Sequence, residues 1–254
     1  MSRNFELMQQ ATQGFDASMP KKDRRLSKAQ DEKVSPPGIS LGSGVAAREE
    51  THKLVQRIFL QHTQNAPRTI VFASVNSGTA SSQICLLVAD ALRASVGGSV
   101  CIVEANFRSP TLPGLIGTTN HYGLTEALIQ LGPIRSFAKP IRSEDVWFIS
   151  SGSVVPDSPN LLDGDRIKER FTELRQEFDY VLVDAPPLSR YADATVLGRI
   201  TDGMVLVLEA DVTRKEVALR VMQNLRASQI KVLGAVLNKR TPPIPEPRSM
   251  AASV

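Results

Sequence analysis

The sequence predicts a doubly wound α/β domain, in which helices cover both faces of a mostly parallel sheet. Short apolar runs alternate with segments of helical periodicity between residues 69 and 237. The run Met204-Val205-Leu206-Val207-Leu208 is continuously apolar, which is typical of a parallel strand buried on both faces. Polar residues follow several of these runs directly, at the sheet edge where such folds bind their ligands.

The predicted elements follow one another in regular alternation. A helix over 48–62 comes first, with Leu54, Val55, Ile58, Phe59 and Leu60 at helical spacing. The apolar runs predict strands at 69–75, 99–105, 146–150, 180–184, 203–208 and 231–237. Helices are predicted between them at 82–96, 124–130, 165–178, 193–200 and 214–227.

Composition divides the chain into four parts. Residues 1–13 are predicted to form a short helix, and residues 14–48, rich in Lys, Asp, Ser, Pro and Gly, a flexible linker. The α/β domain takes residues 49–240, and the proline-rich residues 241–254 are predicted to be a disordered tail. No apolar run is long enough to span a membrane and no signal core opens the chain. We therefore expect a cytoplasmic protein that meets a membrane only through a partner.

Charge and cysteine content narrow the functional classes. The 254 residues carry a net charge of +4, and scattered basic residues with few aromatics between them argue against a nucleic-acid surface. Cys85 and Cys101 lie in apolar runs without C-x-x-C spacing, so buried reduced thiols are expected. The three histidines have no spacing that predicts a catalytic triad.

Residues 75–82, Val-Asn-Ser-Gly-Thr-Ala-Ser-Ser, join the first strand to the next helix, where nucleotide-binding chains carry G-x-x-x-x-G-K-[ST]. Ser82 matches the hydroxyl that holds Mg²⁺, and Gly78 supplies one loop glycine. Ala80 stands at the second glycine of the pattern and Ser81 at the lysine. The segment therefore resembles a phosphate-binding loop that has lost its lysine.

Two further strands end in polar residues. Asp184 closes the strand at 180–184 and precedes Ala185-Pro186-Pro187, the layout of a Walker B acid that holds Mg²⁺ through water. Glu104, Asn106 and Arg108 lie at the end of the strand at 99–105. We therefore predict the remnant of a Mg²⁺ and phosphate site, formed by Ser82, Asp184 and Arg108.

On these motifs the chain resembles the bacterial tyrosine kinases of the CpsD/CapB/Wzc type, P-loop proteins related to MinD and ParA that govern exopolysaccharide and capsule synthesis. The resemblance covers about residues 48 to 239 and includes Gly123-Leu124-Thr125, Ser151-Gly152-Ser153, Phe178-Asp179-Tyr180 and Leu237-Asn238-Lys239. It implies that nucleotide, as Mg-ATP or Mg-ADP, would bind weakly, with Ser82 and Asp184 on the metal. The implied nucleotide-binding residues are Gly78, Thr79, Ala80, Ser81, Ser82, Gln83, Arg108 and Asn238.

Departures from the family pattern predict a degenerate member. In the family the second strand ends D-x-D-x-R, where the aspartates act as base and organise Mg²⁺; this chain has Glu104, Asn106 and Arg108. A carboxamide cannot take a proton as a base, and the added methylene of Glu104 displaces its oxygens. Glu104, Asn106 and Asp184 are thus expected to be catalytic remnants. The tail lacks the tyrosines that active members phosphorylate.

The resemblance also implies partners. These would be a membrane-spanning polysaccharide co-polymerase that regulates chain length, or an active kinase homologue, with recruitment to the inner face of the plasma membrane. Family rings form through an E-x-x-R-x-x-R helix, which Glu49, Glu50, Lys53 and Arg57 match only in part. An ordinary helical ion pair between Glu50 and Lys53 explains these charges equally well, so self-association stays open.

Two alternative functions remain at this stage. The chain could be an active kinase or ATPase whose lysine comes from elsewhere, such as Lys139, Lys239 or a partner. It could also be a positioning ATPase of the MinD/ParA kind. That class needs a lysine early in the loop, where this chain has Asn76 and Ser77.

Overall fold

The computed structural model describes residues 45–60, 66–78, 80–141, 143–153, 161–162 and 164–239. All of them belong to one unit, Pro36–Val254. The predicted helix at 1–13, most of the predicted linker and the predicted tail at 241–254 lie outside the described residues. Within these ranges, no helix has the length and apolar character needed to cross a membrane.

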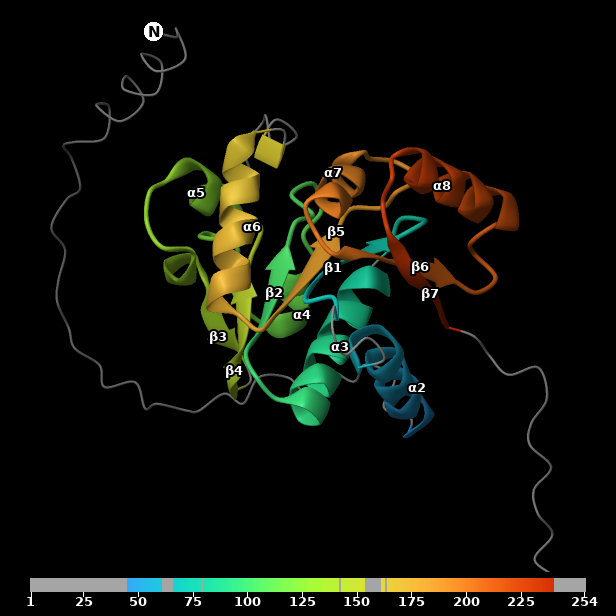
Figure 1. Ribbon diagram of the computed structural model, residues 1–254, viewed down its shortest axis with the longest axis horizontal. Coiled ribbons are helices and arrows are strands. Elements are labelled where there is room, and N and C mark those ends of the chain that lie inside the picture. Colours follow the sequence, from blue (N-terminus) through green and yellow to red (C-terminus); the bar gives the residue numbers. More distant parts are fainter. Residues whose placement is uncertain are drawn as a thin grey trace, which may run out of the picture. The chain divides into compact units, whose positions relative to one another are not determined.

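The described residues form a seven-stranded sheet with the order β3-β4-β2-β5-β1-β6-β7 (Figure 1). Every neighbouring pair is parallel except β3 and β4, which are antiparallel. Such an order requires a crossover between nearly all strands, and helices provide most of them. The strands are β1 (Thr69–Ser74), β2 (Val100–Glu104), β3 (Lys139–Ile141), β4 (Ser143–Ile149), β5 (Tyr180–Ala185), β6 (Gly203–Glu209) and β7 (Val232–Asn238).

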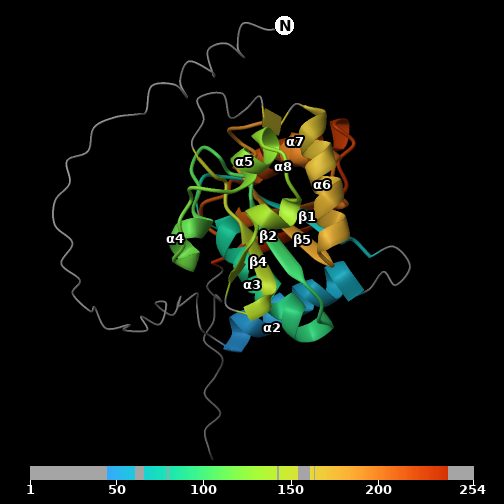
Figure 2. The same cartoon turned by 90° about the vertical axis from the view of Figure 1, so that its left-hand side faces the viewer.

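Helices cover both faces of this sheet (Figures 1 and 2). One face packs on α2 (Val45–Val55), the π-helical turn η1 (Gln56–Leu60), α3 (Ala80–Val96) and α4 (Leu112–Ile116). The other packs on α5 (Leu124–Ile129), the 3₁₀ turn η2 (Ile134–Phe137), α6 (Asp165–Glu177), α7 (Asp193–Arg199) and α8 (Lys215–Ala227). The predicted doubly wound fold is confirmed.

The alternation of side chains along β1 shows why the sequence reads as continuously apolar. Ile70 and Phe72 point to the α3 side, whereas Val71 and Ala73 point to the α6 side, and all four are fully buried. A strand with helices on both faces must be apolar at every position, not at every second one. Cys85 and Cys101 are likewise buried and free, as predicted.

Three short elements were not predicted. They are α4, η2 and β3, each of three to five residues, which is too short to show a period. Pro140 lies inside β3, which is tolerated because β3 is an edge strand. Helix α2 begins at Val45, so residues 45–48, assigned to the linker from composition, are helical.

Candidate functional site

Polar residues meet at the carboxyl ends of three adjacent strands, β2, β5 and β1. β5 lies between β1 and β2, and Glu104 on β2 is level with Asp184 on β5. The N–H of Ala105 donates to the carbonyl of Asp184 at 2.8 Å, which continues the pairing past the end of β2. The loop after β1 therefore lies beside both acids, as the sequence predicts for this edge.

The loop after β1 turns directly into α3. Gly78 has φ +151°, a conformation that favours glycine, and α3 begins at Ala80; Thr79 lies outside the described residues. Ser81, at the lysine position, is 4% exposed, and its N–H donates to Ser74 Oγ at 3.1 Å. A loop amide that could face phosphate is thus bonded within the protein. Gln83 is half-buried in the first turn of α3.

Ser82 connects the loop to Asp184. Its hydroxyl donates to Asp184 Oδ2, and Thr111 Oγ1 lies 2.6 Å from Ser82 Oγ. Because the single proton of Ser82 points to the carboxylate, Thr111 is the donor in the second bond. Asp184 Oδ1 is buried and has no hydrogen-bond partner among the described residues. Burial raises the pKa of Asp184 to about 6, while the bond from Ser82 acts in the opposite direction.

Glu104 points to the start of α4. Its Oε2 accepts the N–H groups of Thr111 at 3.0 Å and Leu112 at 2.8 Å, so the longer side chain caps this helix. Its Oε1 is buried without a partner in the described part of the chain. Burial, and then the charge of Asp184, raise the pKa of Glu104 well above its usual range. Glu104 and Asp184 therefore both hold their protons to higher pH than exposed carboxyl groups do.

The group fits a metal ion better than a triphosphate. Four oxygen-bearing side chains converge, those of Ser82, Glu104, Thr111 and Asp184, and two carboxyl oxygens are unsatisfied, which suits the oxygen preference of Mg²⁺. The described loop residues, 75–78 and 80–82, contribute no lysine or arginine to hold phosphate. Ser82 and Asp184 are the residues that would hold the metal.

Two predicted site residues bond to side chains or backbone outside this group. Asn106 closes its own turn, because Nδ2 donates to the carbonyl of Ser109 at 2.8 Å and Oδ1 accepts the Ser109 N–H at 3.2 Å. Arg108 pairs with Asp193 Oδ2 on α7 at 3.3 Å, and its guanidinium lies 4.4 Å from the ring centre of Tyr191. The structure thus pairs Arg108 with the start of α7, and its contact with phosphate stays a prediction.

Sequence reasoning missed an acid on the other side of the loop. Glu209, the last residue of β6, pairs through Oε1 with Lys239 Nζ at 2.5 Å. Its Oε2 lies 3.8 Å from the position that a β-carbon on Gly78 would take. Asn238, predicted to contact nucleotide, accepts the Lys239 N–H at 2.9 Å. The rule that polar residues at strand ends form the site, applied to β6, would have found Glu209.

The two lysines proposed as substitutes occupy different places. Lys239 follows β7 and reaches the loop through Glu209. Lys139 lies on β3 at the far edge of the sheet, with Nζ 3.4 Å from Thr119 Oγ1. Only Lys239 of these two is therefore beside the loop.

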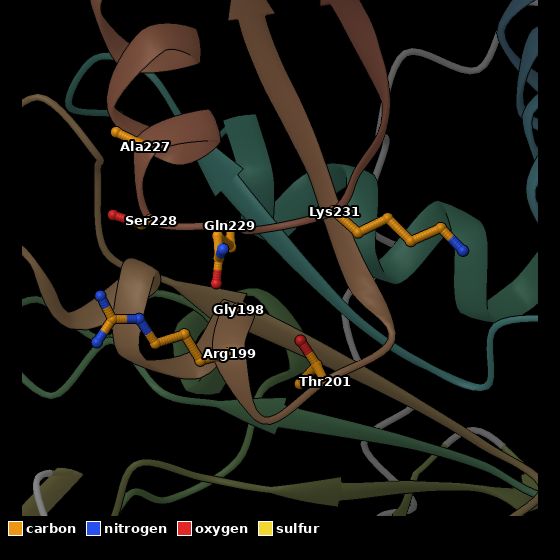
Figure 3. A pocket seen from close by; sticks show the side chains of 7 residues that line it. All are labelled: Gly198, Arg199, Thr201, Ala227, Ser228, Gln229 and Lys231. Atoms are coloured by element: carbon orange, nitrogen blue, oxygen red, sulfur yellow. The ribbon is translucent and has the colours of Figure 1, made fainter.

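A cavity of about 430 Å³ lies at the opposite end of the strands, near the starts of β6 and β7. It is lined by Gly198, Arg199, Thr201, Ala227, Ser228, Gln229 and Lys231. Figure 3 shows the Gln229 side chain directed toward Gly198, while the Arg199 and Lys231 side chains extend to opposite sides. The two cations do not converge on one point in the cavity. None of its lining residues belongs to the phosphate-loop site, so the cavity is separate from that site.

The fold and the loop together define a P-loop NTPase. The profile of the ParA family, described as NUBPL iron-transfer P-loop NTPase, matches residues 65–249. The chain belongs to this family.

Proteins similar in sequence to this chain include bacterial tyrosine kinases, which confirms the predicted resemblance. Tyrosine-protein kinase YwqD of Bacillus subtilis is 31% identical over 145 residues, or 57% of this chain and 61% of YwqD. The putative tyrosine-protein kinase CapB of Staphylococcus aureus is 26% identical over 191 residues, 75% of this chain and 83% of CapB. The kinase domain of the Escherichia coli tyrosine kinase ETK has the same fold, with a TM-score of 0.74, 21% identity and coverage of 86% of each chain.

Proposed function

We propose that this chain is a degenerate relative of the bacterial tyrosine kinases, with impaired or lost ATP hydrolysis and phosphotransfer. It would act as a regulatory or scaffolding subunit in exopolysaccharide or capsule biosynthesis and export. The observation that carries the proposal is Ser81, which is buried at the lysine position and bonded to Ser74. A missing charge-stabilising donor of this kind costs on the order of 10²-fold or more in rate.

The acids support the same conclusion. Phosphotransfer to a hydroxyl needs a base that accepts its proton. Asn106 cannot accept one, and its amide is held in a turn by Ser109. Glu104 is committed to the first N–H groups of α4. Asp184 remains for a metal, so binding of Mg-ATP or Mg-ADP would survive better than catalysis.

The proposed partners rest on the resemblance to the kinase group. They are a membrane-spanning polysaccharide co-polymerase or an active kinase homologue, with the chain recruited to the cytoplasmic face of the plasma membrane. Formation of a homo-oligomer through α2 is an alternative to binding these partners. Lys53 and Glu50 pair within the helix at 2.7 Å, and both side chains are more than half exposed.

A second candidate function is an active ATPase or tyrosine kinase that uses Lys239. The observation in its favour is the position of Lys239, whose ammonium pairs with the Glu209 carboxylate that also lies close to Gly78. A lysine that leaves Glu209 for a bound phosphate would restore the missing charge. This candidate requires Mg-dependent turnover that disappears in Lys239→Ala.

Calorimetric titration with ATP and ADP, with and without Mg²⁺, tests the proposal. We expect the native chain to bind with a Kd on the order of 1 mM or weaker, and Ala80→Gly/Ser81→Lys to bind at least tenfold more tightly. Ala94→Lys is the matched control, because it adds the same charge at an exposed position in the last turn of α3, away from the loop. Micromolar Mg-ATP binding by the native chain, followed by turnover, would contradict the proposal and favour the Lys239 enzyme.

A further inference from the structure

The acid beside the loop, Glu209, lies where a bound anion would compete with it. Its side chain is 17% exposed, and its two oxygens face different groups. Oε1 contacts the ammonium of Lys239 at 2.5 Å, and Oε2 is directed toward Gly78. One carboxylate thus separates the phosphate loop from a lysine.

The backbone fixes the carboxylate at this position. The Glu209 N–H donates to Thr213 Oγ1 at 3.0 Å, and the Glu209 carbonyl accepts the Thr213 N–H at 2.9 Å. β6 and β7 remain paired to their last residues, where Glu209 is level with Asn238. The end of β6 therefore delivers the acid to the loop through ordinary hydrogen bonding, independently of Lys239.

The backbone of Lys239 is held in an unusual conformation. Its φ is +58°, in the left-handed region that lysine rarely adopts, and its N–H is bonded to Asn238 Oδ1. Conformations of this kind persist where surrounding contacts fix them, and they are frequent at ligand sites. The Lys239 side chain itself is 62% exposed, so its ammonium can change partner at little cost.

We propose that Glu209 is an internal competitor for polyphosphate at the loop, and that Lys239 is the cation a polyphosphate recruits when it displaces Glu209. The Glu209 carboxylate opposes anion binding in two ways: it repels an anion near Gly78, and it neutralises the charge of Lys239. A polyphosphate carries more charge than one carboxylate and can take over the ammonium. The inference rests on the proposed function in one respect: the loop has no lysine of its own and retains an anion site.

The test is calorimetric titration with inorganic tripolyphosphate and with ATP, both without Mg²⁺. We expect Glu209→Gln to bind about tenfold more tightly than the native chain, and high salt to reduce this gain. The gain should be absent in Glu209→Gln/Lys239→Gln. Asp211→Asn is the matched control: it removes one negative charge two residues away, and asparagine tolerates the φ of +62° found there.

Each outcome decides the inference. Tighter binding that needs both the loss of Glu209 and the presence of Lys239 supports it. Equal binding by Glu209→Gln and Asp211→Asn overturns it, as does a gain that persists without Lys239, or no measurable binding by any variant. Failure of the inference can be told apart from failure of the proposed function, because the proposed function fails on Mg-dependent turnover by the native chain whatever Glu209→Gln does.

Discussion

Two buried carboxyl groups at the same level of adjacent strands dominate the site at the scale of single residues. Glu104 and Asp184 are 0% and 1% exposed, and each has one oxygen without a partner in the described chain. Burial of unpaired charge is costly, so such groups hold their protons to higher pH or bind a cation. The two carboxyl groups therefore lower the free energy of unfolding near neutral pH. They do so at the ends of strands β2 and β5, which are otherwise mostly apolar and buried.

We predict that Asp184→Asn stabilises the protein at pH 7.5 by about 1–3 kcal/mol and has little effect at pH 4. The folded-state pKa, about 6, exceeds that of the unfolded chain. The carboxyl therefore reduces stability as pH rises from about 4 to about 6, and asparagine removes this loss. Urea unfolding of both proteins across this range measures the difference.

Asp165→Asn is the control for the pH experiment. Lys168 lowers the pKa of Asp165 through a hydrogen bond and its charge, and the pair is exposed. Its contribution is present above the unfolded-state pKa and is lost as pH falls through the lower folded pKa, the opposite sign. A pH-independent effect of Asp184→Asn would show that the Asp184 carboxyl is not the group with the raised pKa.

At the scale of elements, one buried arginine joins α6 to the end of α5. Arg170 is 2% exposed and donates to the carbonyls of Ala127 at 2.7 Å, Gly132 at 2.7 Å and Gln130 at 2.8 Å. It also pairs with Glu173 at 2.8 Å. The last carbonyls of α5 have no intrahelical partner, so this side chain supplies the donors that the helix end lacks.

We predict that Arg170→Ala lowers the free energy of unfolding by about 3 kcal/mol or more, because it removes a buried side chain and leaves the buried Ala127 carbonyl without its donor. Arg166→Ala is the matched control. Arg166 lies one turn earlier on α6 and also donates to the Gln130 carbonyl at 2.8 Å, but its side chain is 34% exposed and its loss should cost about 1 kcal/mol or less. Equal losses in urea unfolding would show that α5 is not held through Arg170.

At the scale of the whole molecule, periodicity and strand-end chemistry predicted most of the architecture. β1, β2 and β5 are buried on both faces, so their apolar runs could be recognised without knowledge of their neighbours. β3 could not be recognised, because three residues containing a proline carry no period and pair only through the hairpin with β4. Long-range pairing decides such short edges, and a single sequence does not encode it locally.

The site was predicted in part for a similar reason. Ser82 and Asp184 were placed together by the rule that parallel strands end at one edge. The direction of a long side chain is settled by packing, and the motif therefore did not predict that Glu104, expected as a catalytic remnant, caps α4 or that Arg108 lies on Tyr191. The same rule locates Glu209 at the site, but its approach to Gly78 and its pairing with Lys239 depend on side-chain packing, which no motif records.

Exposure differs between the centre of the sheet and its β7 edge, and this predicts how local stability is distributed. β1 is buried at every position, whereas β7 is half-buried or exposed throughout and Leu237 is 51% exposed. Few buried contacts and an outward row of N–H groups allow local opening well below the free energy of global unfolding. We therefore expect β7 amides to exchange with solvent at least tenfold faster than those of β1 and β5.

Hydrogen exchange followed by mass spectrometry, at two protein concentrations, measures this difference and also tests self-association. If the chain is monomeric, protection of β7 is low and does not depend on concentration. If a second copy covers the edge, protection of β7 rises with concentration while that of β1 stays unchanged, because β1 lies between β5 and β6. Equal protection of β7 and β1 at both concentrations would contradict the expectation that exposure sets local stability in this sheet.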